Sequence, residues 1–301
     1  MVAVTSSRHR VVHCAVALFR MARPQMIAAG LLVYALGVIM GVRSAGAVDW
    51  PAMGAGLIAL LGANLCAHFA DEFADRDTDA LSRRTWFSGG SGVLPSGLVP
   101  PEFALRAAWV AAGCALMTSV VFTASGLLSP AALGVILIGL AGGWCYSMPP
   151  LALERRGLGE ATNAALGAML IPLLGFATQR NTLTPEAVAG LLPVFTITLV
   201  NLLGVHWADR HADAAVGKRT LAVMLGAHVR HVHRLLTALT YALTWALAGA
   251  VLPPNVAFAI ALTLPISLWA TITFTRRTQD GASSAAMVAL MIAACVGWWL
   301  A

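Results

Sequence analysis

The sequence is poor in charge. Of its 301 residues only 11% are Asp, Glu, Lys or Arg, whereas 59% are hydrophobic, and Lys218 is the single lysine. Soluble domains carry about 25% charged residues, so this composition excludes an ordinary soluble protein. It indicates a membrane protein, much of whose surface faces lipid.

The sequence also lacks the cysteine pairs and the lysine that two common kinds of site require. Its five cysteines stand singly, without a C-x-x-C pair, and this spacing excludes a disulfide or zinc framework. The glycine-rich residues 88–92 are not followed by the lysine of a P-loop, which excludes that type of nucleotide site. We interpret this segment as a loop that either contacts the substrate or only connects two helices.

Long apolar runs dominate the sequence instead. We place runs that are long enough to cross a bilayer at residues 25–42, 50–70, 103–124, 129–146, 159–178, 185–207, 234–252, 256–275 and 284–301. We therefore predict an all-α, polytopic membrane protein with nine transmembrane helices, which form a single domain over residues 1–301. In residues 1–24, arginines surround a short apolar stretch, and we expect an N-terminal cytoplasmic or interfacial helix there.

The positive charges fall on one side of this topology. With a cytoplasmic N-terminus, only Arg43 and Arg180 among the 19 Lys and Arg residues lie on the outer side. This asymmetry favours that orientation, and it accounts for the net charge of +6 without nucleic acid as a partner. We expect an integral protein of the bacterial inner membrane, surrounded by membrane lipids, with its active site at the cytoplasmic face.

Residues 64–79, at the end of the second run, carry five carboxylates within nine positions. On a helix, at about 100° per residue, four of these acids share one face with Asn64 and His68, and only Asp77 points away. A solvated helix end would not need its acids sorted in this way. Because carboxylates stacked a turn apart repel one another unless cations neutralise them, we predict that this face binds Mg²⁺, which prefers oxygen ligands. The predicted ligands are Asp71, Glu72, Asp75 and Asp79.

The sixth run ends in a second acidic face, formed by Asp209 and Asp213 one helical turn apart, with His206 on the same side. If both faces border one cavity, they form two metal-binding walls around a polyanion, and we predict both aspartates as metal ligands. Basic residues follow each face, and Mg²⁺ beside Arg or Lys suits a diphosphate. The predicted diphosphate-binding residues are Asn64, Arg84, Tyr146, Lys218 and Arg219. Alternatively, such cations anchor helix ends to lipid, and interfacial tyrosines often have no further role.

Taken together, these motifs resemble those of the UbiA superfamily of intramembrane prenyltransferases. Arg23 and the proline after it look like the motif that precedes the first span in that family, and the first acidic face resembles its N-D-x-x-D-x-x-x-D signature. Residues 209–226 are similar to its second signature. The segments Y-S-M-P-P-L, from Tyr146, and G-L-G-E, together with the glycine-rich loop, look most like the 1,4-dihydroxy-2-naphthoate prenyltransferase (MenA-like) branch. The sequence departs from the family pattern at Glu72 and at His206.

The resemblance implies helices around a central cavity, with two Mg²⁺ ions holding the diphosphate of a polyprenyl diphosphate. It implies transfer of the polyprenyl group to a small aromatic acceptor, as in quinone or menaquinone biosynthesis. The candidate catalytic residues are His68, His206 and Tyr146; either histidine is also compatible with a purely structural hydrogen bond. The alternatives are a membrane terpene cyclase on the same scaffold and, from another class, a transporter or non-catalytic membrane protein.

Overall fold

The computed structural model describes residues 7–85, 89–276 and 281–301. Within these ranges the regular elements are helices, as the composition and the apolar runs predict. The elements are α1 (Ser7–Met21), α2 (Pro24–Ala45), α3 (Trp50–Ala74), α4 (Arg76–Leu81), α5 (Pro101–Ala124), α6 (Pro130–Ser147), η1 (Leu153–Arg155), α7 (Gly159–Ala164), η2 (Ala165–Leu170), α8 (Ile171–Arg180), α9 (Pro185–Gly190), α10 (Leu192–Ala215), α11 (Leu221–Leu225), η3 (Gly226–His228), α12 (Val229–Leu247), α13 (Pro254–Ala261), α14 (Leu264–Thr273) and α15 (Gly281–Trp299).

Side-chain caps and prolines determine where several of these helices begin. The carboxylate of Asp49 accepts the backbone N–H of Ala52 at 2.9 Å, which caps α3, and the hydroxyl of Ser129 caps α6 in the same way. Proline occupies the first turn of both helices. At that position proline sacrifices no intrahelical hydrogen bond, and the cap satisfies a donor that the helix leaves free.

Eight helical segments of the described chain are long and apolar enough to cross a membrane: α2, α3, α5, α6, residues 159–180, residues 185–215, residues 254–273 and α15. They confirm an integral membrane protein. The nine-span prediction differs by one. The remaining run, residues 234–252, overlaps α12, which is helical but carries Arg230, His231, His233 and Arg234 in its first two turns. These polar residues lower its hydropathy below that of the other spans.

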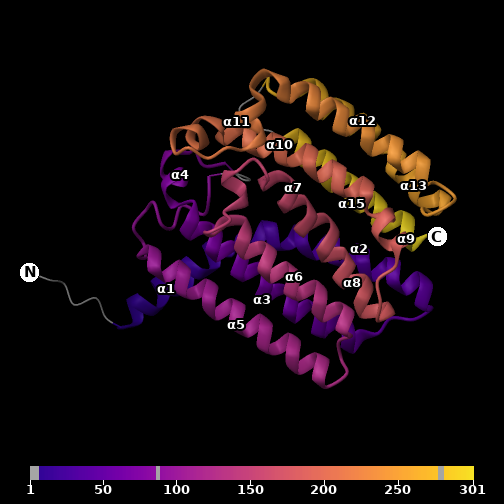
Figure 1. The fold of residues 1–301 in the computed structure, drawn as a ribbon, viewed down its shortest axis with the longest axis horizontal. Coiled ribbons are helices and arrows are strands. Elements are labelled where there is room, and N and C mark those ends of the chain that lie inside the picture. Colours follow the sequence, from indigo (N-terminus) through magenta and orange to yellow (C-terminus); the bar gives the residue numbers. More distant parts are fainter. Residues whose placement is uncertain (1–6, 86–88, 277–280) are drawn as a thin grey trace, which may run out of the picture.

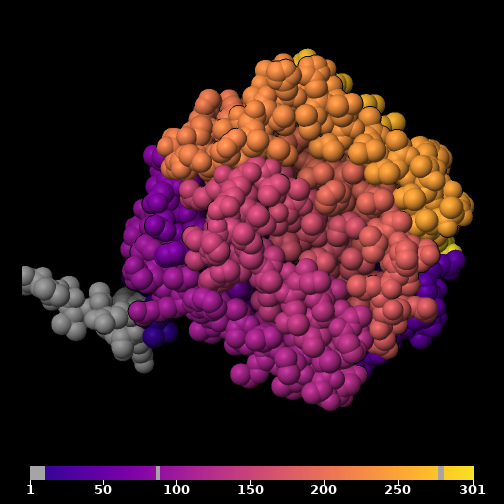
Figure 2. Space-filling view, in the orientation of Figure 1, coloured from indigo at the N-terminus to yellow at the C-terminus, as the bar shows by residue number. Residues whose placement is uncertain are grey.

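The helices pack into two sequence-contiguous halves around a common centre (Figure 1). In the first half, α3 packs against α5 and α6, and α2 against α8; in the second, α10 packs against α12 and α15. Helix α15 also contacts α2, so that the last helix joins the two halves. The space-filling view shows the same division, with the magenta α5 and α6 on one side and the orange α12 and α13 on the other (Figure 2).

Two local features shape the helices at the centre. Gly37 of α2 lies against α8 so closely that a Cβ there would be 1.8 Å from the carbonyl oxygen of Pro172, and only glycine allows this approach. The span at residues 159–180 contains the π-helical turn η2, and Leu166, Gly167 and Leu170 of that turn line the central cavity. Such a turn changes the direction in which the following side chains point.

The loops after α3, α6 and α10 meet at one end of the bundle. The N–H of Arg219 donates to the carbonyl of Arg155 at 3.2 Å, and Lys218 bonds to residues of the two other loops, as described below. At the opposite end, Arg180 donates to the carbonyl of Ser44. The predicted cytoplasmic loops therefore gather at one end of the molecule, where three separate segments can together form a site.

Candidate active site

A cavity of about 470 Å³ lies at the centre of the bundle. Its polar lining includes Arg23, Asn64, His68, Asp71, Asp75, Asp79, Tyr146, Asn163, Asn201, His206, Asp209, Asp213 and Lys218. Its apolar lining includes Val33, Leu60, Val135, Ile136, Leu166, Leu170, Ile171, Leu174, Met287 and Met291. The charged residues come from the end where the three loops meet, whereas the apolar residues come from the spans. The cavity thus suits an amphiphile whose tail lies among the spans and whose polar head is bound together with cations.

The first acidic face lies on the cavity, although the helix that carries it is interrupted. The sequence predicts a continuous helix, but α3 ends at Ala74 and α4 begins at Arg76, on either side of Asp75. The N–H of Asp79 nevertheless donates to the carbonyl of Asp75 at 2.8 Å, so that the helical spacing continues. Asp71, Asp75 and Asp79 consequently all line the cavity. As predicted, Asp77 points away, with 68% of its side chain exposed.

The prediction that Glu72 is a metal ligand requires correction. Glu72 is only 1% exposed and is not part of the cavity lining. Its Oε1 accepts hydrogen bonds from the Arg23 guanidinium, at 3.0 and 2.8 Å, and from the N–H of Ser91 at 2.7 Å, while its Oε2 accepts the Ser91 hydroxyl at 2.6 Å. Both oxygens are thus occupied by protein donors. Glu72 fastens the glycine-rich loop and Arg23 to α3 instead of facing the cavity.

Two predicted diphosphate-binding residues also lie outside the cavity. Arg84 and Arg219 have exposed side chains, and neither lines the cavity. Arg84 lies against Gly92 of the glycine-rich loop, and Arg219 is engaged through its backbone with Arg155. Arg23 takes the place of such a cation: it lines the cavity and forms an ion pair of 3.1 Å with Asp71. The Arg-Pro motif drew attention to Arg23 in the sequence. No spacing in the sequence, however, indicated that Arg23 lies beside the acidic residues.

Lys218 lies among acidic side chains at the polar end. Its ammonium donates to Oδ2 of Asp75 at 2.6 Å and to Oε2 of Glu154 at 2.7 Å. Burial would lower the pKa of Lys218, but the neighbouring carboxylates of Asp75 and Glu154 outweigh it and raise the pKa well above its usual value. The lysine is therefore a fixed positive charge in the cavity wall.

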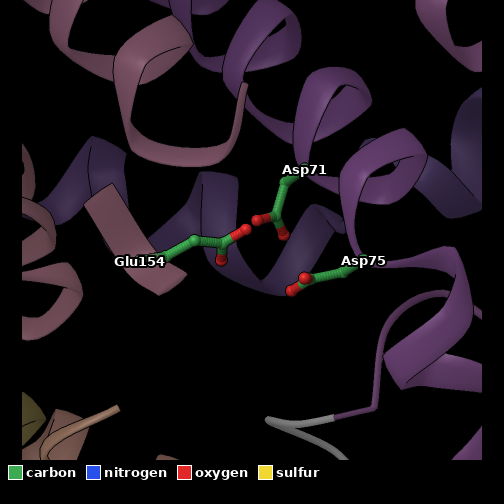
Figure 3. Close-up of side chains that lie close together, drawn as sticks. All are labelled: Asp71, Asp75 and Glu154. Atoms are coloured by element: carbon green, nitrogen blue, oxygen red, sulfur yellow. The ribbon is translucent and has the colours of Figure 1, made fainter. Parts of the chain in front are cut away.

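Glu154, from η1, is a site residue that sequence reasoning missed. One oxygen each of Asp71, Asp75 and Glu154 lie within 4.8 Å of one another, and Figure 3 shows the Asp71 and Glu154 carboxylates turned toward each other with Asp75 beside them. The second oxygen of Glu154, Oε1, is buried and accepts no hydrogen bond from the described residues. This donor set, rich in carboxylate oxygen, suits a divalent cation.

Asp79 closes the first wall next to the glycine-rich loop. Burial, together with the carboxylates of Asp75 and Asp71, raises the pKa of Asp79 to about 8. A Cβ on Gly90 would lie 1.8 Å from Oδ2 of Asp79, so the loop backbone packs directly on this carboxylate. Gly89 and Gly90 line the cavity, while the start of the predicted glycine-rich segment, Ser88, lies outside the described residues.

The second acidic face lies across the cavity on α10, as its spacing predicts. His206, Asp209 and Asp213 all line the cavity. Oδ2 of Asp213 accepts the hydroxyl of Thr220 at 3.3 Å. The ring nitrogen Nδ1 of His206 lies 2.7 Å from Oε1 of Glu160, a fully buried residue of α7. Glu160 is the last residue of the G-L-G-E segment that resembles the MenA-like branch, but the sequence assigned it no role in the site.

The remaining predicted residues, Asn64, His68 and Tyr146, also line the cavity. His68 and Asn64 lie on α3 about one and two turns before Asp71, and Tyr146 lies near the end of α6. The structure thus brings together two carboxylate walls, a lysine, an arginine and a tyrosine above an apolar interior. With divalent cations on its carboxylates, such a site can neutralise a polyanionic head while the tail stays out of water.

Comparison with known proteins places this architecture in a family. The sequence profile of the UbiA prenyltransferase family matches residues 30–297. A curated relative, the bacteriochlorophyll synthase 33 kDa chain of Cereibacter sphaeroides, is 26% identical over 189 residues, which are 60% of this chain and 57% of that protein. The chain therefore spans little more than half the length of this relative.

Solved structures share the fold. A UbiA homologue from Archaeoglobus fulgidus bound to DMAPP and Mg²⁺ is 17% identical, with a TM-score of 0.68 over 93% of this chain and 99% of that one. The same homologue bound to GPP and Mg²⁺ gives a TM-score of 0.69 at 17% identity, over 95% of this chain and all of the other.

Proposed function

The chain belongs to the UbiA prenyltransferase family, and we propose that it catalyses Mg²⁺-dependent transfer of a prenyl group from a prenyl diphosphate to a small aromatic acceptor within the membrane. One observation carries this proposal: a single cavity joins two carboxylate walls and Lys218 at its polar end to an apolar interior made by the spans. A prenyl diphosphate has the matching division between a trianionic head and a hydrocarbon tail.

The residues present fit Mg²⁺ ions. The close approach of Asp71, Asp75 and Glu154, and the unpartnered buried oxygen of Glu154, favour one cation at the first wall. Asp209 and Asp213 would hold a second ion from the opposite wall. When bound, the ions supply positive charge that neutralises the diphosphate and makes it a better leaving group. The DMAPP and GPP complexes of the archaeal homologue, each with Mg²⁺, support this assignment.

The chain's own residues perform the rest of the donor chemistry. Lys218 and Arg23 are placed to donate charge-assisted hydrogen bonds to diphosphate oxygens, which stabilises the charge that develops as the C1–O bond breaks. Tyr146 offers a further donor, and Asn64 offers another about two helical turns before Asp71 along α3. The apolar lining, for example Leu166 and Met291, holds the tail and keeps water away from the allylic cation.

The acceptor would enter beside the diphosphate. Asn163 and Asn201 border the cavity and provide amide groups for the hydroxyls of an aromatic ring. We propose a quinone precursor of the dihydroxynaphthoate type, on the resemblance of the Tyr146 and Glu160 motifs to that branch. The curated relative, a bacteriochlorophyll synthase chain, adds a tetrapyrrole precursor to the acceptors that a test must include. We place the polar end of the cavity at the cytoplasmic side of a bacterial inner membrane.

Turnover of radiolabelled donors by the purified protein in lipid vesicles tests the proposal. Dimethylallyl, geranyl and geranylgeranyl diphosphate are offered with Mg²⁺, each with and without dihydroxynaphthoate, hydroxybenzoate, homogentisate or a bacteriochlorophyll precursor. A labelled lipid-soluble conjugate that needs both Mg²⁺ and one acceptor is the expected product. A cyclised hydrocarbon or alcohol formed without acceptor would identify a terpene cyclase instead. Failure of every donor to release diphosphate would overturn the enzymatic proposal.

A further inference from the structure

His206 and Glu160 form a pair that the proposed metal and diphosphate sites do not use. Nδ1 of His206 lies 2.7 Å from Oε1 of Glu160, and the same oxygen accepts the backbone N–H of Leu221 at 2.8 Å. His206 lines the cavity, whereas Glu160 is fully buried outside it. The carboxylate of Glu160 therefore fixes the orientation of the imidazole. The backbone N–H of Leu221, in the segment that follows Lys218, in turn holds this carboxylate in place.

The position of His206 along α10 places it near the level at which the first carbon of the prenyl chain and the acceptor would react. It precedes Asp209 by three residues, which places it about 4.5 Å further from the polar end. If the diphosphate lies at the level of Asp209 and Asp213, the first prenyl carbon and the acceptor lie near His206. On the opposite wall His68 precedes Asp71 by the same spacing, but among the described residues no carboxylate forms a hydrogen bond with His68.

We infer that His206, oriented by Glu160, takes the proton that the acceptor gives up when it is prenylated; this inference rests on the proposed prenyl transfer. The C1–O bond of the donor breaks, and its electron pair leaves with the diphosphate. A ring carbon of the acceptor then forms the new bond to C1. The C–H electron pair of that ring carbon returns to the ring as its proton moves to Nε2 of His206.

Glu160 has two tasks in this step. It holds Nδ1, so that Nε2 is the nitrogen left to accept a proton, and its negative charge stabilises the imidazolium that forms, as the buried carboxylate does in a Ser-His-Asp triad. His206 is the catalytic residue and Glu160 a positioning residue. The substrate class follows: the acceptor carries a hydrogen on the ring carbon that is prenylated.

Separate measurement of donor ionisation and transfer tests this inference. The probes are labelled geranyl diphosphate and Mg²⁺, with dihydroxynaphthoate, hydroxybenzoate or homogentisate as acceptor. Glu160→Gln keeps the size and an acceptor oxygen but removes the charge, so we expect kcat for transfer to fall by about 10²–10⁴-fold, the usual contribution of general-base catalysis. The acceptor KM and the Mg²⁺-dependent release of diphosphate without acceptor should change little. Glu160→Asp, which retains the charge, should recover part of the loss.

The control is Glu186→Gln, the same change at an exposed carboxylate of α9 outside the cavity. An equal fall of ionisation and transfer in Glu160→Gln would show a structural role and overturn the inference, as would unchanged transfer. If the wild-type protein ionises the donor but prenylates none of the three acceptors, the acceptor assignment is wrong although the donor site stands. If the wild-type protein does not ionise the donor, the proposed function itself fails.

Discussion

Lys218 donates a hydrogen bond of 2.6 Å to Asp75, which lies 143 positions earlier in the chain. The lysine is almost fully buried, and its partners Asp75 and Glu154 belong to two other segments of the site. The bond therefore ties the loop after α10 to the carboxylate wall at the end of α3, and it presents the ammonium to the cavity.

Replacing Lys218 with methionine should weaken donor binding. The variant loses charge-assisted hydrogen bonds worth about 1.5–3 kcal/mol to the diphosphate, which corresponds to roughly a 10–100-fold rise in Kd. Titration with a non-hydrolysable analogue of geranyl diphosphate measures this. Arg219→Met, which removes the adjacent but exposed cation, should leave Kd unchanged. Equal losses in the two variants would contradict the different places that the structure gives these residues.

The acidic walls should be indispensable for turnover. Asp75→Asn and Asp209→Asn each remove a carboxylate from one wall of the cavity, and each should abolish Mg²⁺-dependent release of diphosphate while the protein stays folded. Asp77→Asn provides the matched control, because Asp77 lies within the same run of acids but is exposed. Steady-state assays together with thermal unfolding in detergent separate activity from folding. Activity that survives in both wall variants would refute the metal-site assignment.

Glu72 should matter for stability and not for metal binding. In Glu72→Ala the Arg23 guanidinium and Ser91 lose a buried partner, and breaking such a buried pair costs about 3–5 kcal/mol. We expect a clear drop in the unfolding temperature, with Glu186→Ala as an exposed control. Mg²⁺ affinity of the folded fraction, measured by calorimetry, should fall much less than in Asp75→Asn. An equal fall of Mg²⁺ affinity in the two variants would show that Glu72 is a metal ligand after all.

Mg²⁺ binding without donor should strengthen with pH up to about 8. The pKa of Asp79 is raised to about 8 by burial and by neighbouring carboxylates, so at neutral pH the metal-free protein holds a proton there. A bound cation requires the carboxylate, so that proton must leave, and the apparent affinity weakens as the pH falls below the pKa. Calorimetry in buffers of different ionisation enthalpy reports the released proton. Asp79→Asn should flatten the pH dependence; an unaltered slope would exclude Asp79 as its source.

The glycine-rich loop should be sensitive at Gly90 in particular. Gly90 has φ of +62°, and a Cβ there would meet Oδ2 of Asp79 at 1.8 Å; Gly97 has φ of +69° but no atom within 4 Å. Alanine at either position costs about 1–2 kcal/mol for its backbone conformation. Only Gly90→Ala should also displace Asp79 and reduce Mg²⁺ affinity. If the two variants bind Mg²⁺ equally well, the contact with Asp79 has no part in the site.

Much of the helical framework and part of the site follow from local sequence. A bilayer requires long apolar helices, and composition alone therefore predicts an all-α membrane protein. Helical spacing predicted that Asp71, Asp75 and Asp79 share a face. This prediction holds across the break at Asp75 because the next helical turn continues from that residue. The same reasoning placed His206, Asp209 and Asp213 together. For α12, local sequence predicted the helix correctly, but the polar residues in its first two turns keep it out of the eight apolar spans.

Helical spacing gave wrong predictions for side chains whose position depends on contacts with other segments of the chain. Glu72 lies next to Asp71 in the sequence, yet the Arg23 guanidinium and the Ser91 loop occupy both its oxygens. Arg84 and Arg219 follow the acids closely, but their loops turn them outward. None of these outcomes is encoded in helical periodicity, because each depends on where a distant loop lies.

The sequence by itself determined the membrane class, most of the spans and the two acidic faces, since these depend on hydropathy and on the fixed 3.6-residue turn of a helix. Only the tertiary structure decided that Glu154 and Lys218 join the first wall, that Glu160 holds His206, and that Glu72 does not face the cavity. The pair of His206 with Glu160 and the pair of Lys218 with Glu154 connect residues 46 and 64 positions apart. They are set by how the helices pack and where their loops meet, which no local pattern records.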